Sequence, residues 1–235
     1  MCAGDSITHG FMSANYVRML MDDLGPRGYE FVNAGISGDL AFNLLPRLDD
    51  VVGCRPDVVT VLIGTNDAAA HIDEKWRLSY MRHQRLPQTP TLDWYRTTLL
   101  EIVRRLKADT CAQIALLEIP PIGENLQSVH NHWVERHNQA IRDVGAVTGV
   151  RVLEVHGRLV ALLPPGRRPA PFDGSKKLMA RALAGKFLGH KSWNDISSKN
   201  NLTILTDQIH LNEVGARVVA ELIEEFLVAD CFAAE

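Results

Sequence analysis

The chain has 235 residues, of which 46% are hydrophobic and 23% are charged, and its formal net charge is −3. This composition is typical of a globular protein with a continuous core, and it lacks the clustered basic excess that nucleic-acid binders usually carry. No apolar run approaches the ~20 residues of a transmembrane helix, so we expect no stable membrane insertion.

The start of the chain and its cysteines indicate the cellular compartment that we expect. Candidate catalytic residues begin at Gly4, so we expect no secretory signal peptide before them. The four cysteines are scattered, with no metal-ligand spacing, at Cys2, Cys54, Cys111 and Cys231. We therefore expect reduced thiols, a cytoplasmic location and no metal site. The oligomeric state leaves no signature in the sequence.

Helical and strand patterns alternate through the first part of the chain. Apolar spacing predicts a helix over about 13–24, a short strand over 29–33 and a second helix over 40–48. A continuous β-branched run at 57–63 is typical of a strand that is buried on both faces of a parallel sheet.

The alternation continues to the end of the chain. A long helix over 92–106 precedes a strand over 113–119, and a helix over 131–146 precedes a strand over 150–155. The last helix carries apolar residues on one face over 214–226. Such alternation predicts a parallel sheet with helices on both faces. No repeat or linker divides the 235 residues, so we expect one domain.

Two stretches do not fit this alternation. Residues 69–91 are polar and basic, and residues 157–206 form a connection whose length is typical of a functional lid. Within the longer stretch, 172–191 has the pattern of a basic amphipathic helix. It either covers the acyl or alcohol pocket, with Phe187 and Trp193 as contacts, or simply packs on the domain.

Four segments stand out, each at the C-terminal end of a predicted strand or just before a helix, the edge where ligands bind in open α/β sheets. In the first, Ser6 stands at a tight turn that enters a helix, where its oxygen is exposed among free backbone N–H groups. In the second, Gly38 lets a backbone N–H approach a substrate oxygen. Alone, each has an ordinary alternative: a helix N-cap for Ser6 and a simple turn for Gly38.

The third and fourth segments supply an amide and an Asp–His pair. Asn66 follows the buried strand, where its carboxamide suits a developing oxyanion or caps the next helix. Asp207 and His210 stand three residues apart before the last helix. The carboxylate can accept from imidazole Nδ1–H while Nε2 faces a nucleophile, although a lone histidine is more often structural.

Together, the four segments resemble the SGNH hydrolases, also called the GDSL family. The matching residues span positions 4 to 215 and include Gly4-Asp5-Ser6, Gly38, Gly64-Thr65-Asn66-Asp67 and Asp207-Gln208-Ile209-His210. The resemblance implies a flavodoxin-like, three-layer α/β/α fold whose five parallel strands have the order 2-1-3-4-5. It also implies ester hydrolysis without a cofactor.

The resemblance further implies a role for each site residue. Ser6 is the nucleophile, His210 is the general base and then the acid, and Asp207 orients His210. The Ser6 N–H, the Gly38 N–H and the Asn66 side chain form the oxyanion hole. His9, beside the nucleophile, either contacts substrate or supports its loop, and Asp67, the last residue of the third motif, is a possible substrate contact.

The chain departs from the family pattern before Gly4. Only Met1, Cys2 and Ala3 precede this residue, whereas family members usually carry a longer hydrophobic strand there. We therefore expect a truncated first strand, and we hypothesise that the full protein has further residues upstream.

The expected function is hydrolysis of small-molecule or glycan carboxylic esters through an acyl-enzyme. A lipase-like or general carboxylesterase is favoured, because the long insertion offers apolar side chains. Carbohydrate O-acetylesterase, lysophospholipase and thioesterase activities are the alternatives. A non-catalytic binding module on the same fold is less favoured, since every catalytic position is filled. A receiver would need an acidic cluster with a phosphoacceptor aspartate, and a flavin-binding domain would need a phosphate-cradling loop, which residues 4–10 imitate poorly.

Overall fold

The computed structural model describes residues 1–166, 170–172 and 176–231. Five parallel strands form one sheet in the order β2-β1-β3-β4-β5, which confirms the predicted topology. The strands are β1 (Cys2–Gly4), β2 (Asn33–Gly35), β3 (Val58–Leu62), β4 (Gln113–Leu117) and β5 (Arg151–Leu153).

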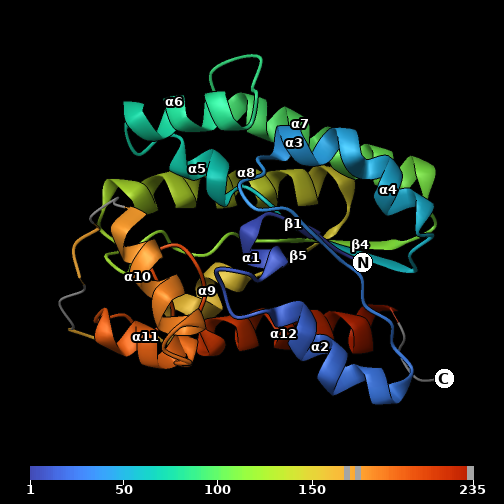
Figure 1. The fold of residues 1–235 in the computed structure, drawn as a ribbon. Coiled ribbons are helices and arrows are strands. Elements are labelled where there is room, and N and C mark those ends of the chain that lie inside the picture. The colour runs from blue at the N-terminus through green and yellow to red at the C-terminus, as the bar shows by residue number, and fades with distance from the viewer. Residues whose placement is uncertain (167–169, 173–175, 232–235) are drawn as a thin grey trace.

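Helices cover both faces of the sheet, as the flavodoxin-like prediction requires (Figure 1). One layer contains α3 (Ala41–Leu44), α4 (Leu48–Gly53), α5 (Thr65–Ala69), α7 (Leu92–Asp109) and α8 (Val129–Thr148). The other contains α2 (Tyr16–Leu24), α9 (Val155–Val160) and α12 (Glu213–Phe226). Short irregular helical turns complete the layers at η1 (Gly25–Arg27), η2 (Leu45–Arg47) and η3 (Leu227–Cys231).

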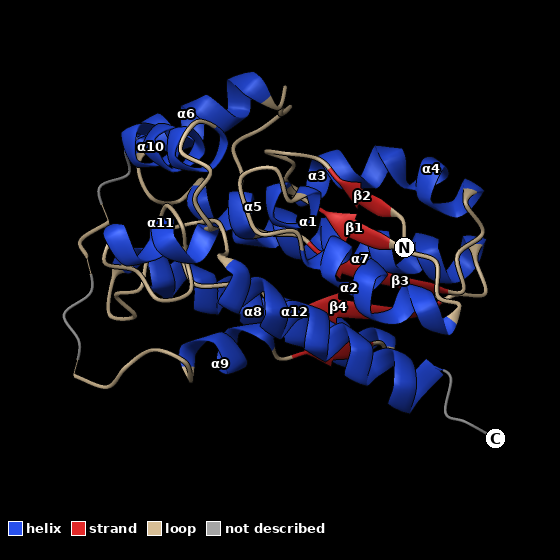
Figure 2. Ribbon diagram, turned by 60° about the horizontal axis from the view of Figure 1, so that its bottom comes forward, coloured by secondary structure: helices blue, strands red, loops and turns tan. Residues whose placement is uncertain are grey.

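The remaining helices gather at one end of the sheet, the end toward which β1 points (Figure 2). They are α1 (Ser6–His9), α6 (Glu74–His83), α10 (Lys176–Phe187) and α11 (Trp193–Lys199). Among the described residues, every helix is too short or too polar to cross a membrane. The carboxyl ends of the strands are therefore covered by segments that the minimal α/β pattern does not contain.

Strand β1 is central and short. Its three residues are fully buried and pair in parallel with β2 on one side and β3 on the other. The Met1 amino group donates to the Val58 carbonyl at 2.9 Å, which extends the contact with β3 by one residue. The strand ends at Gly4, so the chain turns at once into α1.

Two elements differ from the sequence prediction. Strand β2 lies at Asn33–Gly35 instead of 29–33, because pairing on this side starts with the Cys2 N–H, which donates to Val32 O at 2.9 Å. Helix α6 lies within the polar stretch 69–91, where no helix is predicted. Its N-cap is Asp73, whose carboxylate accepts from the Trp76 N–H at 2.8 Å.

The long insertion at 157–206 contains α10 and α11, and its residues 167–169 and 173–175 lie outside the described residues. Ala182 of α10 and Trp193 and Ile196 of α11 belong to the hydrophobic core. Phe187, at the end of α10, is 50% exposed. The insertion therefore packs on the domain through one face and leaves an aromatic side chain at the surface.

Arg47 ties the carboxyl ends of β1 and β2 together. Its Nη2 donates to Gly4 O at 2.9 Å, and its Nη1 donates to Ala34 O at 2.7 Å. Its Nε donates to the Asp39 carboxylate at 2.8 Å, and both side chains are largely buried. The planar guanidinium thus donates to three acceptors at once, two strand-end carbonyls and one carboxylate.

We predict that Arg47→Lys lowers the free energy of unfolding by about 2 kcal/mol, because one ammonium group cannot reach acceptors on two strands and a carboxylate at once. Urea denaturation measures the change. Arg105→Lys is the matched control, since Arg105 pairs with Asp49 and Asp109, whose carboxylates are exposed, and serves no strand end among the described residues. An equal loss of stability in both variants would contradict the role given to Arg47.

Candidate active site

Ser6 is positioned by the sharp turn between β1 and α1. A Cβ at Gly4 would collide with the Thr8 side chain and the Leu62 carbonyl, so only glycine lets the strand end here. The Asp5 carboxylate caps α1 by accepting from the Ile7 N–H at 2.9 Å. Ser6 is the first residue of α1, and its N–H consequently has no partner within the helix.

A continuous hydrogen-bond chain joins Ser6, His210 and Asp207. The Ser6 hydroxyl lies 3.0 Å from His210 Nε2, although the two residues are 204 positions apart. His210 Nδ1 lies 2.8 Å from Asp207 Oδ2. An ionised carboxylate only accepts hydrogen bonds, so Nδ1 carries the proton and Nε2 is left to accept from Ser6.

The charges in this chain favour a basic imidazole. Burial lowers the pKa of His210, but the negative charge and hydrogen bond of Asp207 outweigh it and raise the pKa above its usual value. Burial likewise opposes ionisation of Asp207, yet the charge of His210 and hydrogen bonds from His210 and Ile209 hold the pKa of Asp207 below its usual range. Asp207 therefore stays ionised while His210 gains and loses a proton.

The turn that carries Asp207 and His210 is held in an uncommon conformation. Gln208 has φ of 76°, a left-handed value that few non-glycine residues adopt. Asp207 Oδ1 accepts from the N–H groups of Ile209 and His210 at 3.1 and 2.9 Å. The Gly123 N–H donates to Gln208 O at 2.7 Å. These bonds point both functional side chains toward Ser6.

Glu124 anchors the segment that leads into this turn, a role that sequence reasoning missed. Its buried carboxylate accepts from the backbone N–H groups of Thr203, Ile204 and Leu205 at 2.7, 2.8 and 3.3 Å. The sequence offers one signal for this role, an acidic residue in an apolar segment just after β4. An acidic side chain buried in such a segment needs hydrogen-bond donors, which the backbone can supply.

The oxyanion-hole candidates follow three neighbouring strands. Ser6 follows β1, Gly38 follows β2, and Asn66 is the second residue of α5, which follows β3. Gly38 has φ of 87°, which favours glycine. Asn66 is buried, and its Nδ2 donates to Asp39 O at 2.8 Å while its Oδ1 accepts from the Tyr80 hydroxyl at 2.6 Å. The structure thus brings all three to the sheet edge where Ser6 lies.

His9 and Phe187, two of the predicted substrate contacts, lie on one surface next to the nucleophile turn. His9 ends α1, and its Nδ1 lies 3.4 Å from the Ser37 hydroxyl. Its ring lies 6.4 Å from that of Phe11, and Phe11 stacks on Phe187 at 5.1 Å. The two phenylalanine rings are 53% and 50% exposed, so they are available to a ligand.

The other two predicted contacts, Asp67 and Trp193, are buried and form hydrogen bonds within the protein. The Asp67 carboxylate accepts from the Ala41 N–H at 3.1 Å at the start of α3, and burial raises the pKa of Asp67 to about 7. Trp193 is only 5% exposed. The backbone N–H of Trp193 donates to the Glu213 carboxylate at 2.7 Å, and the Lys186 ammonium lies 5.3 Å from the Trp193 ring centre. Trp193 thus lies in the hydrophobic core, which agrees with the alternative that this insertion packs on the domain.

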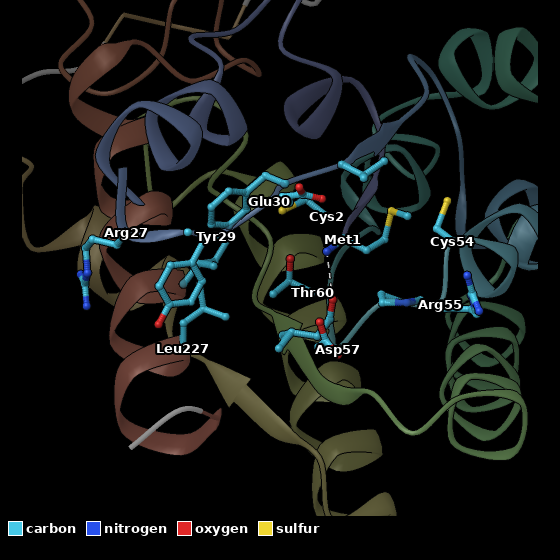
Figure 3. A pocket seen from close by; sticks show the side chains of 16 residues that line it. Met1, Cys2, Arg27, Tyr29, Glu30, Cys54, Arg55, Asp57, Thr60 and Leu227 are labelled. Atoms are coloured by element: carbon cyan, nitrogen blue, oxygen red, sulfur yellow. Dashed lines mark hydrogen bonds between the residues drawn. The ribbon is translucent and has the colours of Figure 1, made fainter. Parts of the chain in front are cut away.

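A hollow of about 560 Å³ lies at the opposite end of the sheet. Its lining includes no member of the triad, no oxyanion-hole candidate and no predicted substrate contact. Figure 3 shows it between Tyr29 and Arg55, with Met1 and Asp57 between them. It lies at the amino ends of the strands, away from the Ser6 turn. Within the described residues, no group of three histidine, cysteine or acidic side chains is arranged to hold a metal ion.

Solved structures share this architecture at low sequence identity. The acetyl xylan esterase AlAXEase is 19% identical, with a TM-score of 0.66, and the match covers 95% of this chain and 96% of that one. The acetylxylan esterase Axe2 from Geobacillus stearothermophilus is 21% identical, with a TM-score of 0.65 and coverage of 94% and 90%. LAE5, an alpha/beta hydrolase from the metagenome of Lake Arreo in Spain, is 22% identical, with a TM-score of 0.63 and coverage of 99% and 95%. These similarities show a shared fold.

The sequence itself gives the family. A search of curated protein sequences finds no match. The model of the GDSL-like Lipase/Acylhydrolase family matches residues 2–218, which is nearly the whole chain and includes every proposed site residue. The chain therefore belongs to the GDSL-like lipase/acylhydrolase family and is a serine ester hydrolase.

Proposed function

We propose that the protein hydrolyses carboxylic esters through an acyl-enzyme formed on Ser6. The observation that carries this proposal is the 3.0 Å contact between the Ser6 hydroxyl and His210 Nε2, within a chain that ends at the ionised Asp207. A serine hydroxyl is a weak nucleophile until a base takes its proton, and this contact supplies the base.

The proposed reaction has two halves. His210 Nε2 takes the hydroxyl proton as Ser6 Oγ attacks the ester carbonyl carbon, and the protonated imidazole then gives that proton to the departing alcohol. Water attacks the acyl-enzyme in the second half, with His210 again as base and then as acid, and the carboxylic acid leaves. Asp207 stabilises the imidazolium that forms in each half and holds its Nδ1–H.

Negative charge builds on the carbonyl oxygen in both halves. The donors proposed to meet it are the N–H groups of Ser6 and Gly38 and the Asn66 carboxamide, which follow three adjacent strands of a rigid sheet. Donors fixed before the reaction stabilise the transition state without reorganisation, and each contributes about 10²–10³ in rate.

We predict that Ser6→Ala lowers kcat by at least about 10⁴-fold, because no oxygen is left to form the acyl-enzyme. Rapid mixing of the wild type with p-nitrophenyl acetate should also give a burst of nitrophenol equal to the enzyme concentration. Near-wild-type hydrolysis by Ser6→Ala, with an unchanged melting temperature, would end the proposal.

We predict that kcat/KM falls as pH drops through the raised pKa of His210, because the protonated imidazole cannot act as a base. Asp207→Asn removes the charge that raises this pKa, so the midpoint moves to lower pH and the plateau falls by about 10⁴-fold. Asp5→Asn is the control: the charge of Asp5 raises the His210 pKa less than Asp207 does, so the midpoint moves less. Equal midpoints in the wild type and Asp207→Asn would contradict the assignment.

The proposed substrate surface is the aromatic pair Phe11 and Phe187 beside His9. Half-exposed, stacked rings offer an apolar face to an acyl chain, which favours a lipase-like or general carboxylesterase. A second candidate is a carbohydrate O-acetylesterase, since the similar solved structures include acetylxylan esterases. A sugar ring can also lie on an aromatic face.

A substrate panel separates the two candidates. We predict that Phe187→Ala raises KM about 10-fold for the longest of a series of p-nitrophenyl esters running from acetyl to octanoyl, since about 1.5 kcal/mol of apolar contact is lost. Val147→Ala, which also removes an exposed apolar side chain, is the matched control. The panel also includes acetylated xylooligosaccharides, and a KM change confined to them would favour the carbohydrate candidate. An unchanged KM for every ester would show that Phe187 does not belong to the site.

A further inference from the structure

Helix α6, which the sequence pattern does not predict, contacts two of the proposed oxyanion donors. Tyr80 and Gln84 stand one turn apart at its carboxyl end. The Tyr80 hydroxyl donates to Asn66 Oδ1 at 2.6 Å. The Gln84 carboxamide lies against Gly38 so closely that a Cβ on Gly38 would collide with it. The helix therefore packs on the oxyanion side of the site.

The orientation of the Asn66 carboxamide decides whether it can serve an oxyanion. Its two ends have nearly the same shape, but Nδ2 donates and Oδ1 only accepts. Nδ2 has two hydrogens, of which one goes to Asp39 O at 2.8 Å, so the second can serve another acceptor. A flipped carboxamide would turn Oδ1 toward the Asp39 carbonyl oxygen, where two acceptors repel each other.

Tyr80 is the partner that holds the opposite end. Burial raises the pKa of Tyr80 far above its usual value, so the side chain keeps its hydroxyl hydrogen. Asn66 Oδ1 is an acceptor only, so Tyr80 donates in this contact. The Asp39 carbonyl accepts a hydrogen bond from Nδ2, and the Tyr80 hydroxyl donates one to Oδ1. Only one orientation of the Asn66 carboxamide satisfies both groups.

We propose that Tyr80 is a positioning residue that fixes the Asn66 carboxamide with Nδ2 directed to the oxyanion. The inference rests on the proposed function, because it needs an oxyanion that Asn66 serves. Tyr80 itself does not touch the substrate. Its effect falls on the steps in which charge builds on the carbonyl oxygen, and it leaves the Ser6–His210–Asp207 chain intact.

The first test is Tyr80→Phe, which removes only the hydroxyl. We expect kcat for p-nitrophenyl acetate to fall about 10-fold, as for the loss of one buried hydrogen bond worth ~1.4 kcal/mol, with KM and the pH midpoint unchanged. Tyr95→Phe is the matched control, because its buried hydroxyl donates to Ile63 O at 3.0 Å and not to Asn66. It should lose similar stability and keep its kcat.

The second test places the same change in an Asn66→Ala background. Asn66→Ala alone should lower kcat by about 10²–10³-fold, and adding Tyr80→Phe should then lower it no further. If Tyr80→Phe folds poorly by thermal denaturation, Tyr80→Met, which also lacks the hydroxyl, provides the same comparison.

The outcomes separate this inference from the proposed function. An active Ser6→Ala would overturn both. An inactive Ser6→Ala together with a wild-type kcat for Tyr80→Phe would overturn the positioning role alone. The positioning role alone would also be overturned if Tyr80→Phe lowered kcat equally in the wild type and in Asn66→Ala, or if Asn66→Ala kept the wild-type kcat.

Discussion

The site depends on one hydrogen bond, between the Ser6 hydroxyl and His210 Nε2. The two residues come from opposite ends of the chain, so the bond exists only if the whole sheet is assembled. β1 ends at Gly4, and its central position places Ser6 at the carboxyl edge of the sheet. The turn before α12 must then bring His210 to the same edge, which no local preference of the sequence can do.

Three polar side chains with several hydrogen-bond partners each support that bond. Asp207 accepts from His210 and two backbone N–H groups, Glu124 accepts from three N–H groups, and Arg47 serves two strand ends and Asp39. A buried ionised group is costly without such partners, and with them it permits few alternative arrangements. Arg47 holds the end of β1, and Glu124 and Asp207 hold the segment that carries His210, so the reacting groups are oriented before substrate arrives, as electrostatic catalysis requires.

Much of the fold follows from the sequence, because apolar runs and helical spacing alternate clearly and their connections allow few topologies. The site motifs were identifiable because Ser6, Asn66 and His210 each follow a strand or precede a helix. Tyr80 and Glu124 were missed, since their partners are distant in sequence and no pattern links them. The sequence also left open whether Trp193 packs inside or faces a ligand, because an aromatic residue in an insertion has the same pattern in both cases. The position of β2 depended on where β1 begins to pair, which composition does not reveal.

The central claim is that His210 activates Ser6 as a nucleophile. A fluorophosphonate tests it directly, because the activated oxygen displaces fluoride at phosphorus and leaves a stable adduct. Mass spectrometry of digested protein should locate one adduct on Ser6 in the wild type, and His210→Ala should form it at least about 10³-fold more slowly. An adduct on another residue, or equal labelling rates in the wild type and His210→Ala, would contradict the account.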